Sequence, residues 1–148
     1  MKTVILDTDV LVNWLAMETE PLTQRKLWAA PLRIIESMEA KEIRGYVSLT
    51  SILEIRFLLK RKFKRSANDV NEDVALISGL FDILVPDRME LLRANKLQEE
   101  YSLDPFDAIL LATTFSLPSA ILISRDSKFL AIAARLTEAM LPEKFLLH

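Results

Sequence analysis

The chain has 148 residues, of which 51% are hydrophobic, so it can bury one substantial core and is too short for two ordinary domains. Its net charge of −2 does not by itself point to a polyanionic partner. The absence of cysteine excludes disulfides and thiolate chemistry and fits a reducing compartment, and no apolar run reaches the roughly 20 residues of a membrane span. We therefore expect a single cytoplasmic domain over residues 1–148, without membrane association.

Short apolar runs alternate with helix-like stretches along the chain. The runs predicted as strands are 4–6, 46–47, 83–85 and 120–123, and the last run, 145–147, is predicted as an edge strand. The stretches with helical periodicity are 10–17, 26–40 (with Pro31 a kink or break), 52–64, 70–80, 89–101, 106–115 and 128–136. This alternation is typical of an α/β fold with a parallel sheet.

Five carboxylates follow the predicted strands or open the predicted helices. Asp7 and Asp9 come directly after the first strand, in Val-Ile-Leu-Asp-Thr-Asp, and Asp126 ends the stretch Ile-Leu-Ile-Ser-Arg-Asp. Glu54 and Asp107 lie near the beginning of two helices. The carboxyl ends of parallel strands share one edge of a sheet, where ligands bind, so we expect these acids to lie near that edge.

Helix capping is the alternative explanation for each acid taken singly. Ser51 to Glu54 and Asp104 to Asp107 have the spacing of a capping box. Asp87 shows the same pattern and is interpreted, like Asp104, as a plain cap. The ordered convergence of several acids favours a functional site, because carboxylates at close range repel one another unless a cation neutralises them.

The remaining composition narrows the chemistry to that of a metal site. The only histidine is the terminal His148, and two glycines, Gly45 and Gly79, are too few for a dinucleotide fingerprint or a P-loop. Hard oxygen ligands favour one or two Mg²⁺ or Mn²⁺ ions, which activate water at a phosphodiester without a histidine. The predicted metal ligands and catalytic residues are four acids: Asp7, Glu54, Asp107 and Asp126.

Three further residues are predicted to support this site. Ser124 faces the same way as Asp126 on an extended segment, so it would contact metal-bound water or make a strand-end hydrogen bond. Asp9 would bind a second cation or orient Thr8 and the helix start.

Basic residues cluster toward the end of the helix that carries Glu54, and they are Arg56, Lys60, Arg61, Lys62, Lys64 and Arg65. They would grip phosphates or complement the dipole at the helix C-terminus. Arg56, Lys60, Arg61 and, after the fourth strand, Arg125 are the candidates for substrate binding. The aromatic residues Phe57, Phe63, Trp14 and Trp28 are predicted as core residues, or as dimer contacts for the tryptophans, and not as stacking platforms.

The ordered set Ile-Leu-Asp-Thr-Asp-Val-Leu, Ser-Ile-Leu-Glu-Ile, Phe-Asp-Ala-Ile-Leu-Leu-Ala and Ile-Ser-Arg-Asp-Ser-Lys-Phe resembles PIN-domain ribonucleases over nearly the whole chain. The resemblance implies a three-layer α/β/α sandwich with a mainly parallel sheet of four or five strands, and a metal-dependent endoribonuclease acting on RNA. It places the four acids on the metal positions of the family and Thr8, Asp9 and Ser124 on assisting ones. It departs from the family at Asp9, where asparagine is more frequent, and at Lys128, where an acid is frequent.

The resemblance also bears on partners, because many single-domain members of this length are VapC-type toxins that pair with an antitoxin and form homodimers. Two other functions stay open. An Asp-x-Asp after a strand also resembles the nucleophile motif of haloacid-dehalogenase-like phosphohydrolases, with Asp7 attacking phosphorus. The fold could also serve as a catalytically idle module that binds RNA or protein.

Overall fold

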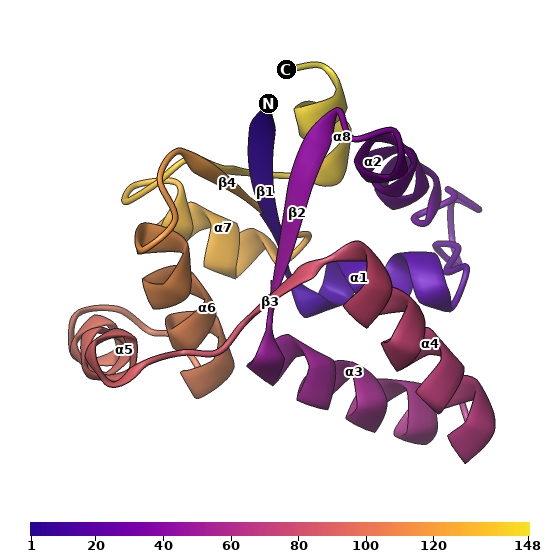
Figure 1. Ribbon diagram of the computed structural model, residues 1–148, viewed down its shortest axis with the longest axis horizontal. Helices are drawn as coiled ribbons and strands as arrows, with labels where there is room; N and C mark the ends of the chain where they lie inside the picture. The colour runs from indigo at the N-terminus through magenta and orange to yellow at the C-terminus, as the bar shows by residue number, and fades with distance from the viewer.

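Figure 1 shows the computed structural model of residues 1–148, in which five strands and eight helices alternate along the chain. The strands are β1 Lys2–Leu6, β2 Ile43–Ser48, β3 Asp82–Leu84, β4 Ala120–Ile123 and β5 Ala139–Met140. The helices are α1 Thr8–Leu15, α2 Ala29–Glu39, α3 Leu49–Arg61, α4 Ala67–Leu80, α5 Arg88–Glu100, α6 Pro105–Phe115, α7 Ser127–Ala133 and α8 Pro142–Leu146. None of these helices combines the length and apolar composition that a membrane crossing requires.

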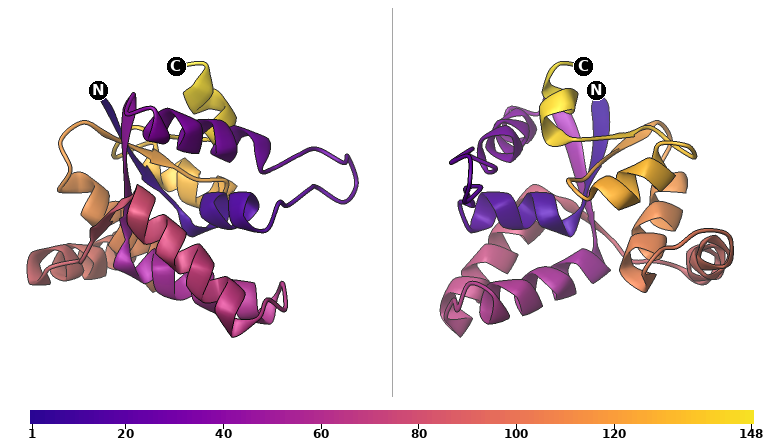
Figure 2. Two further views of the ribbon diagram at one scale, coloured as in Figure 1. Left: turned by 45° about the vertical axis from the view of Figure 1, so that its right-hand side comes forward. Right: turned by 180° about the vertical axis from the view of Figure 1, so that it is seen from behind.

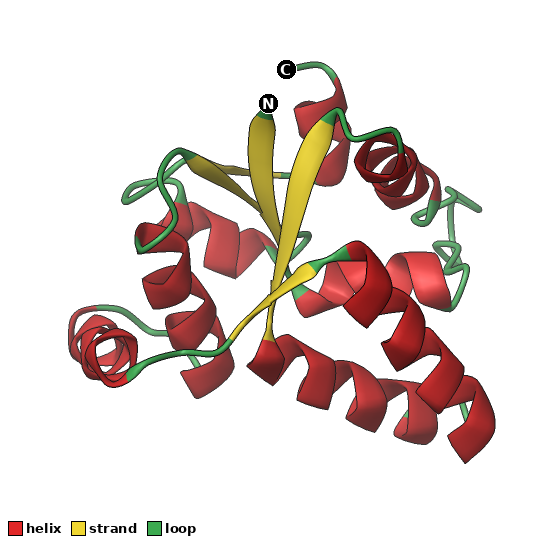
Figure 3. Cartoon of the chain, viewed as in Figure 1, coloured by secondary structure: helices red, strands yellow, loops and turns green.

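The strands form one sheet in the order β3-β2-β1-β4-β5, and every neighbouring pair is parallel. The central strand is β1, where Val4 pairs with Gly45 on one side and with Ile121 on the other. All strands therefore end at the same edge, at the lower end of the sheet in Figures 1 and 3. The predicted α/β class with a parallel sheet is confirmed.

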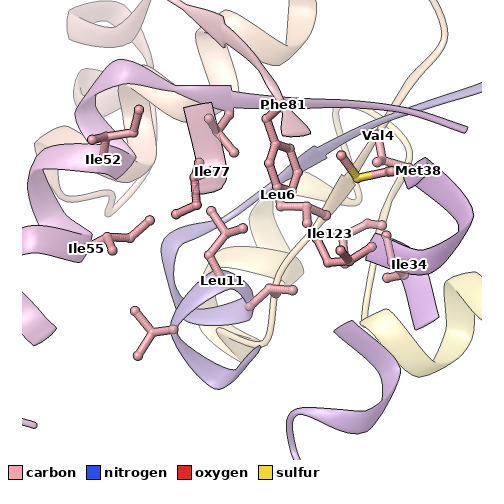
Figure 4. Packing of buried hydrophobic residues seen from close by; sticks show 14 of the residues in the cluster. Val4, Leu6, Leu11, Ile34, Met38, Ile52, Ile55, Ile77, Phe81 and Ile123 are labelled. Atoms are coloured by element: carbon pink, nitrogen blue, oxygen red, sulfur yellow. The ribbon is translucent and has the colours of Figure 1, made fainter. Parts of the chain in front are cut away.

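Helices cover both faces of the sheet, as Figure 2 shows from two further sides. Successive side chains of a strand point to opposite faces, so Val4 and Leu6 join one buried cluster while Ile5 joins the other. The first cluster is filled from α1, α2, α3, α4 and α8 and is shown in Figure 4, and the second is filled from α5, α6 and α7. The three-layer arrangement is therefore confirmed.

Polar caps set the helix boundaries. Six helices begin one to three residues before the predicted start, because the capping side chains that accept backbone N–H groups are Asp7, Ser48, Ser66, Asp87, Asp104 and Asp126. Asp87 forms a full capping box with Glu90, and Asp104 is an N-cap, as predicted. The capping box predicted from Ser51 to Glu54 is wrong, since Ser48 caps α3 and Ser51 lies inside it. Pro31 lies in the first turn of α2, where proline is tolerated, so it neither kinks nor breaks the helix.

The predicted edge strand at 145–147 is wrong. The fifth strand is Ala139–Met140, and the following residues form the helix α8 with Pro142 in its first turn. Phe145 is buried, whereas Leu147 is 90% exposed. A run of three apolar residues cannot distinguish a strand from a helix, and the proline preorganises the helical start.

We predict that Phe145→Ala lowers the free energy of unfolding by about 3 to 5 kcal/mol, because it leaves a cavity beneath α8. Leu147→Ala is the matched control and should change stability by less than about 0.5 kcal/mol. Urea denaturation followed by circular dichroism measures both. Equal losses in the two variants would indicate a strand, in which both side chains share a buried face.

Candidate active site

Asp7 and Asp126 are joined by Ser124 at the ends of the two central strands. The Asp7 carboxylate caps α1 by accepting the Thr8 backbone N–H at 2.7 Å through Oδ1, and its Oδ2 accepts the Ser124 hydroxyl at 2.7 Å. The same Ser124 oxygen accepts the Asp126 backbone N–H at 3.1 Å. Asp126 in turn caps α7 through Oδ1. Capping and a place at the site are therefore compatible, because each carboxylate keeps further lone pairs.

Glu54 reaches the same edge from α3. The Thr8 hydroxyl donates to Glu54 Oε1 at 2.9 Å, so one buried threonine lies between the acid that caps α1 and the acid on α3. Thr8 thus contacts one of the predicted ligands, and its supporting role in the site stays a prediction. The contact also explains why a polar group is stable one turn into a helix that packs on α1.

Asp107 enters the site from the first turn of α6, which begins beside α3 in Figures 1 and 2. Its backbone N–H donates to the carboxylate of the N-cap Asp104 at 2.9 Å. Asp104 was interpreted only as a cap, yet its charge also raises the pKa values of Asp7, Glu54 and Asp107. Sequence reasoning missed this second role. The signal was available, since Asp104 and Asp107 lie three residues apart at one helix start.

Four of the acids at this edge have raised pKa values, because they are partly removed from water and lie near other acids. Burial raises the pKa of Asp7 to about 6 and, with the charge of Asp7 nearby, raises the pKa of Asp9 to about 7. Burial followed by neighbouring acids raises the pKa of Glu54 to about 7 and that of Asp107 to about 8. The hydrogen bonds from Ser124 and Thr8 to Asp7 only partly oppose these shifts.

Asp9 makes a contact that neither of its two predicted roles, binding a second cation or orienting Thr8 and the helix start, includes. Its Oδ2 accepts the Arg125 backbone N–H at 3.0 Å, so Asp9 holds the turn between β4 and α7. Its Oδ1 is buried and has no hydrogen-bond partner in the protein. A buried carboxylate oxygen without a partner is costly and calls for a cation or a water.

The donor set fits a hard divalent cation. All the groups are carboxylate or hydroxyl oxygens, and the acids repel one another where they are buried. No group of three or more acidic side chains lies close enough together to hold a metal ion by itself, so water would have to supply most of the coordination. This suits Mg²⁺, which commonly binds proteins through one or two carboxylates and keeps several waters.

Arg125 does not lie where a substrate-binding residue would. Its side chain is 10% exposed, and its guanidinium binds Glu143, Asn13 and the Leu27 carbonyl instead of facing solvent. The prediction that Arg125 contacts substrate therefore conflicts with the structure. Sequence reasoning also missed Asn13 and Glu143, because nothing in their local pattern indicates this contact.

The basic cluster on α3 divides into two groups. Lys62 pairs with Glu18 at 3.7 Å, and Arg65 pairs with Asp73 at 3.0 Å, so these two have structural partners. The remaining members are exposed, namely Arg56, Lys60 and Arg61 on α3 and Lys64 just after its end. With Leu53 and Phe57 they line a shallow hollow.

The predicted core role of Phe57 is wrong. Its side chain is 58% exposed, with the Arg61 guanidinium above its ring at 5.3 Å. Phe63 and Trp14 pack against the buried core as predicted, and Trp28 is partly buried. Helical spacing misled the interpretation because Leu53 and Phe57 lie four residues apart on a face that no other element covers.

The model of the PIN domain family matches residues 4–135. The chain belongs to the PIN-domain family. Members of this family are nucleases and generally depend on divalent metal ions, in agreement with the acidic donor set described above. Family membership disfavours the phosphohydrolase alternative, because the whole fold and not only the Asp-x-Asp stretch matches. No curated protein sequence is similar enough to count as a relative.

Solved structures share the fold of this PIN domain at low sequence identity. The toxin-antitoxin complex from Klebsiella pneumoniae aligns with a TM-score of 0.66 and 21% identity, covering 94% of this chain and 97% of that one. FitAcB from Neisseria gonorrhoeae aligns with a TM-score of 0.65 and 16% identity, covering 95% of this chain and 98% of that one. VapBC2 from Rickettsia felis, bound to a DNA fragment from its promoter, aligns with a TM-score of 0.66 and 12% identity, covering 93% of this chain and 98% of that one.

We predict that the metal-free protein loses stability as pH rises from about 5 to 8. The folded acids keep their protons up to pKa values of about 6 to 8, whereas the unfolded chain ionises near the model values of 3.8 to 4.5. The unfolded state is therefore favoured increasingly with pH, until the folded acids ionise too. Thermal unfolding in EDTA at several pH values measures the trend.

Added Mn²⁺ should reverse this trend, because the metal competes with protons and stabilises the folded state more at pH 8 than at pH 5. Asp107→Asn removes the group with the highest pKa and should flatten the metal-free slope. A melting temperature that stays level or rises between pH 5 and 8 in EDTA would contradict the crowded-acid description.

Proposed function

We propose that this PIN domain is a cytoplasmic, Mg²⁺- or Mn²⁺-dependent endoribonuclease. The observation that carries the proposal is the set of mutually repelling acids at the carboxyl edge of the sheet, one buried and the others partly buried or exposed, which no basic side chain neutralises. Such a site favours the binding of a divalent cation, and it has no histidine or thiol for other hydrolytic chemistry.

We assign the residues of the site to metal binding or to the orientation of the metal ligands. The metal would be bound by carboxylates of the set Asp7, Glu54, Asp107 and Asp126, directly or through water, and it would supply an activated water and charge stabilisation at the phosphodiester. Ser124 orients Asp7 through its 2.7 Å hydrogen bond, and Thr8 orients Glu54 at 2.9 Å. The orphan Oδ1 of Asp9 supports a second cation or an ordered water beside the first.

The exposed basic side of α3 supports binding of the RNA backbone. Arg56, Lys60 and Arg61 lie on the helix that carries Glu54, so phosphates held there would lead toward the acids. Arg125 is left out of this set because its guanidinium is occupied.

Two protein partners are also proposed. The fold is similar to those of the toxin-antitoxin complex from Klebsiella pneumoniae and VapBC2 from Rickettsia felis, which supports a toxin role with an antitoxin partner. Leu53 and Phe57, which border the basic hollow, also line a second hollow between α3 and α6 with Glu54, Leu58 and Phe106, and we assign the apolar side chains of this second hollow to contact with a second copy of the chain.

We predict that the wild-type protein cuts RNA with Mg²⁺ or Mn²⁺, that EDTA abolishes cutting, and that Asp7→Asn and Asp126→Asn each reduce the rate at least about 100-fold by removing a metal ligand. A fluorescently labelled RNA resolved by electrophoresis gives the rate. Asp87→Asn is the matched control, because Asp87 is also a strand-to-helix cap but lies in an exposed capping box.

Other outcomes of this assay identify the alternatives. Full activity in Asp7→Asn would sink the metal-site proposal. Turnover of small phosphomonoesters with a trapped aspartyl phosphate would indicate phosphohydrolase chemistry. RNA binding that needs no metal and leads to no cleavage would indicate an idle binding module.

The proposed homodimer has its own test. Leu53→Glu places a further charge among the apolar side chains of this hollow and should halve the molar mass measured by light scattering. Leu76→Glu is the matched control, since Leu76 is an exposed leucine on α4 outside the hollow and should leave the mass unchanged. A monomeric wild type would reject the dimer.

A further inference from the structure

Arg125 connects four separate parts of the chain directly behind the acids. Its Nη1 and Nη2 donate to the two carboxylate oxygens of Glu143 on α8 at 2.9 and 2.6 Å. Nη2 also donates to the Leu27 carbonyl at 2.8 Å, and Nε donates to the Asn13 side chain on α1. A planar guanidinium can make all these bonds at once, whereas the point charge of a lysine cannot.

The backbone of Arg125 acts on the acids themselves. Its N–H donates to Asp9 Oδ2 at 3.0 Å, and its two neighbours are Ser124, which binds Asp7, and Asp126. Any shift of residue 125 must therefore displace the groups that hold Asp7, Asp9 and Asp126. The other side chain of the turn that bonds a distant residue is Ser124, through Asp7.

The helix α1 is held at two points by this single residue. Asp9 and Asn13 lie four residues apart, so they share one face of α1. The first binds the Arg125 backbone and the second its side chain. Because α1 begins at Asp7 and carries Thr8, its rotation sets where the carboxylates of Asp7 and Asp9 point.

We propose that Arg125 is a positioning residue that fixes the acid cluster against α1, and that Glu143 on α8 acts on the metal site through it. The inference rests on the proposed function, since it concerns how that site is held. It goes beyond the site because it makes the affinity for the metal depend on the C-terminal helix α8. In this role Arg125 positions the acids and does not bind substrate phosphates.

The main test is Arg125→Lys, which keeps the positive charge and removes the planar guanidinium with its several hydrogen-bond donors. We expect the affinity for Mn²⁺, measured by calorimetry, to fall roughly 10- to 100-fold, as is typical when a group that orients metal ligands is changed. We expect kcat to fall while KM for RNA stays within about twofold, because no substrate contact is lost. The dependence of RNA binding on salt should keep its slope, whereas Arg56→Ala should reduce that slope by about one.

Two further variants separate positioning from general stability. Glu143→Gln keeps the size of the side chain and removes its charge, so it should weaken Mn²⁺ binding in the same direction by a smaller factor. Arg65→Lys is the matched control, because Arg65 also pairs with a carboxylate, Asp73, and binds a backbone carbonyl, that of Leu15, away from the acids. It should lower thermal stability and leave the Mn²⁺ affinity unchanged.

The outcomes are distinguishable. A wild type that binds no Mn²⁺ and cuts no RNA overturns the proposed function and this inference with it. An active wild type with unchanged Mn²⁺ affinity in Arg125→Lys overturns the positioning role alone. A raised KM with a reduced salt slope in Arg125→Lys would show that Arg125 binds substrate. An equal loss of Mn²⁺ affinity in Arg65→Lys would show that the loss in Arg125→Lys comes from general destabilisation of the fold.

Discussion

The junction between β1 and β4 determines the geometry of the rest of the molecule. Where the two strands end, the Asp7 backbone N–H donates to the Ile123 carbonyl at 2.9 Å, and the Asp7 carboxylate accepts the Ser124 hydroxyl. These bonds join residues more than a hundred positions apart at the centre of the sheet. Because α1 and α7 both begin at this junction, the pairing of two strands decides where the acids of both helices lie.

The acidic edge is a place where stability and function oppose each other. Buried carboxylates with raised pKa values lower the stability of the metal-free fold, and the neighbouring hydroxyls and backbone N–H groups offset only part of that cost. The structure tolerates them because several are also helix caps, so the bonds that begin α1, α6 and α7 are made by acids at or beside the site. A cation would relieve the remaining repulsion and so bind to the folded form.

The positive charges are kept apart from the acids. Arg125 is the basic residue nearest to the cluster in sequence, yet its guanidinium forms a bidentate pair with Glu143 and leaves the acids without a counter-charge. The exposed cations instead follow the outer side of α3, where they can meet a polyanion. This separation would allow one small domain to hold the proposed metal and a phosphate backbone at adjacent places.

The amino-acid sequence by itself determined the alternation of strands and helices, since hydrophobic periodicity and polar caps act over a few neighbouring residues. It also indicated that Asp7, Glu54, Asp107 and Asp126 share one edge, because parallel strands end together. Only the tertiary structure decided that residues 142–146 form a helix, that Phe57 lies uncovered and that the Arg125 guanidinium is buried against Glu143. These outcomes depend on which distant elements pack together, and local patterns carry no record of that.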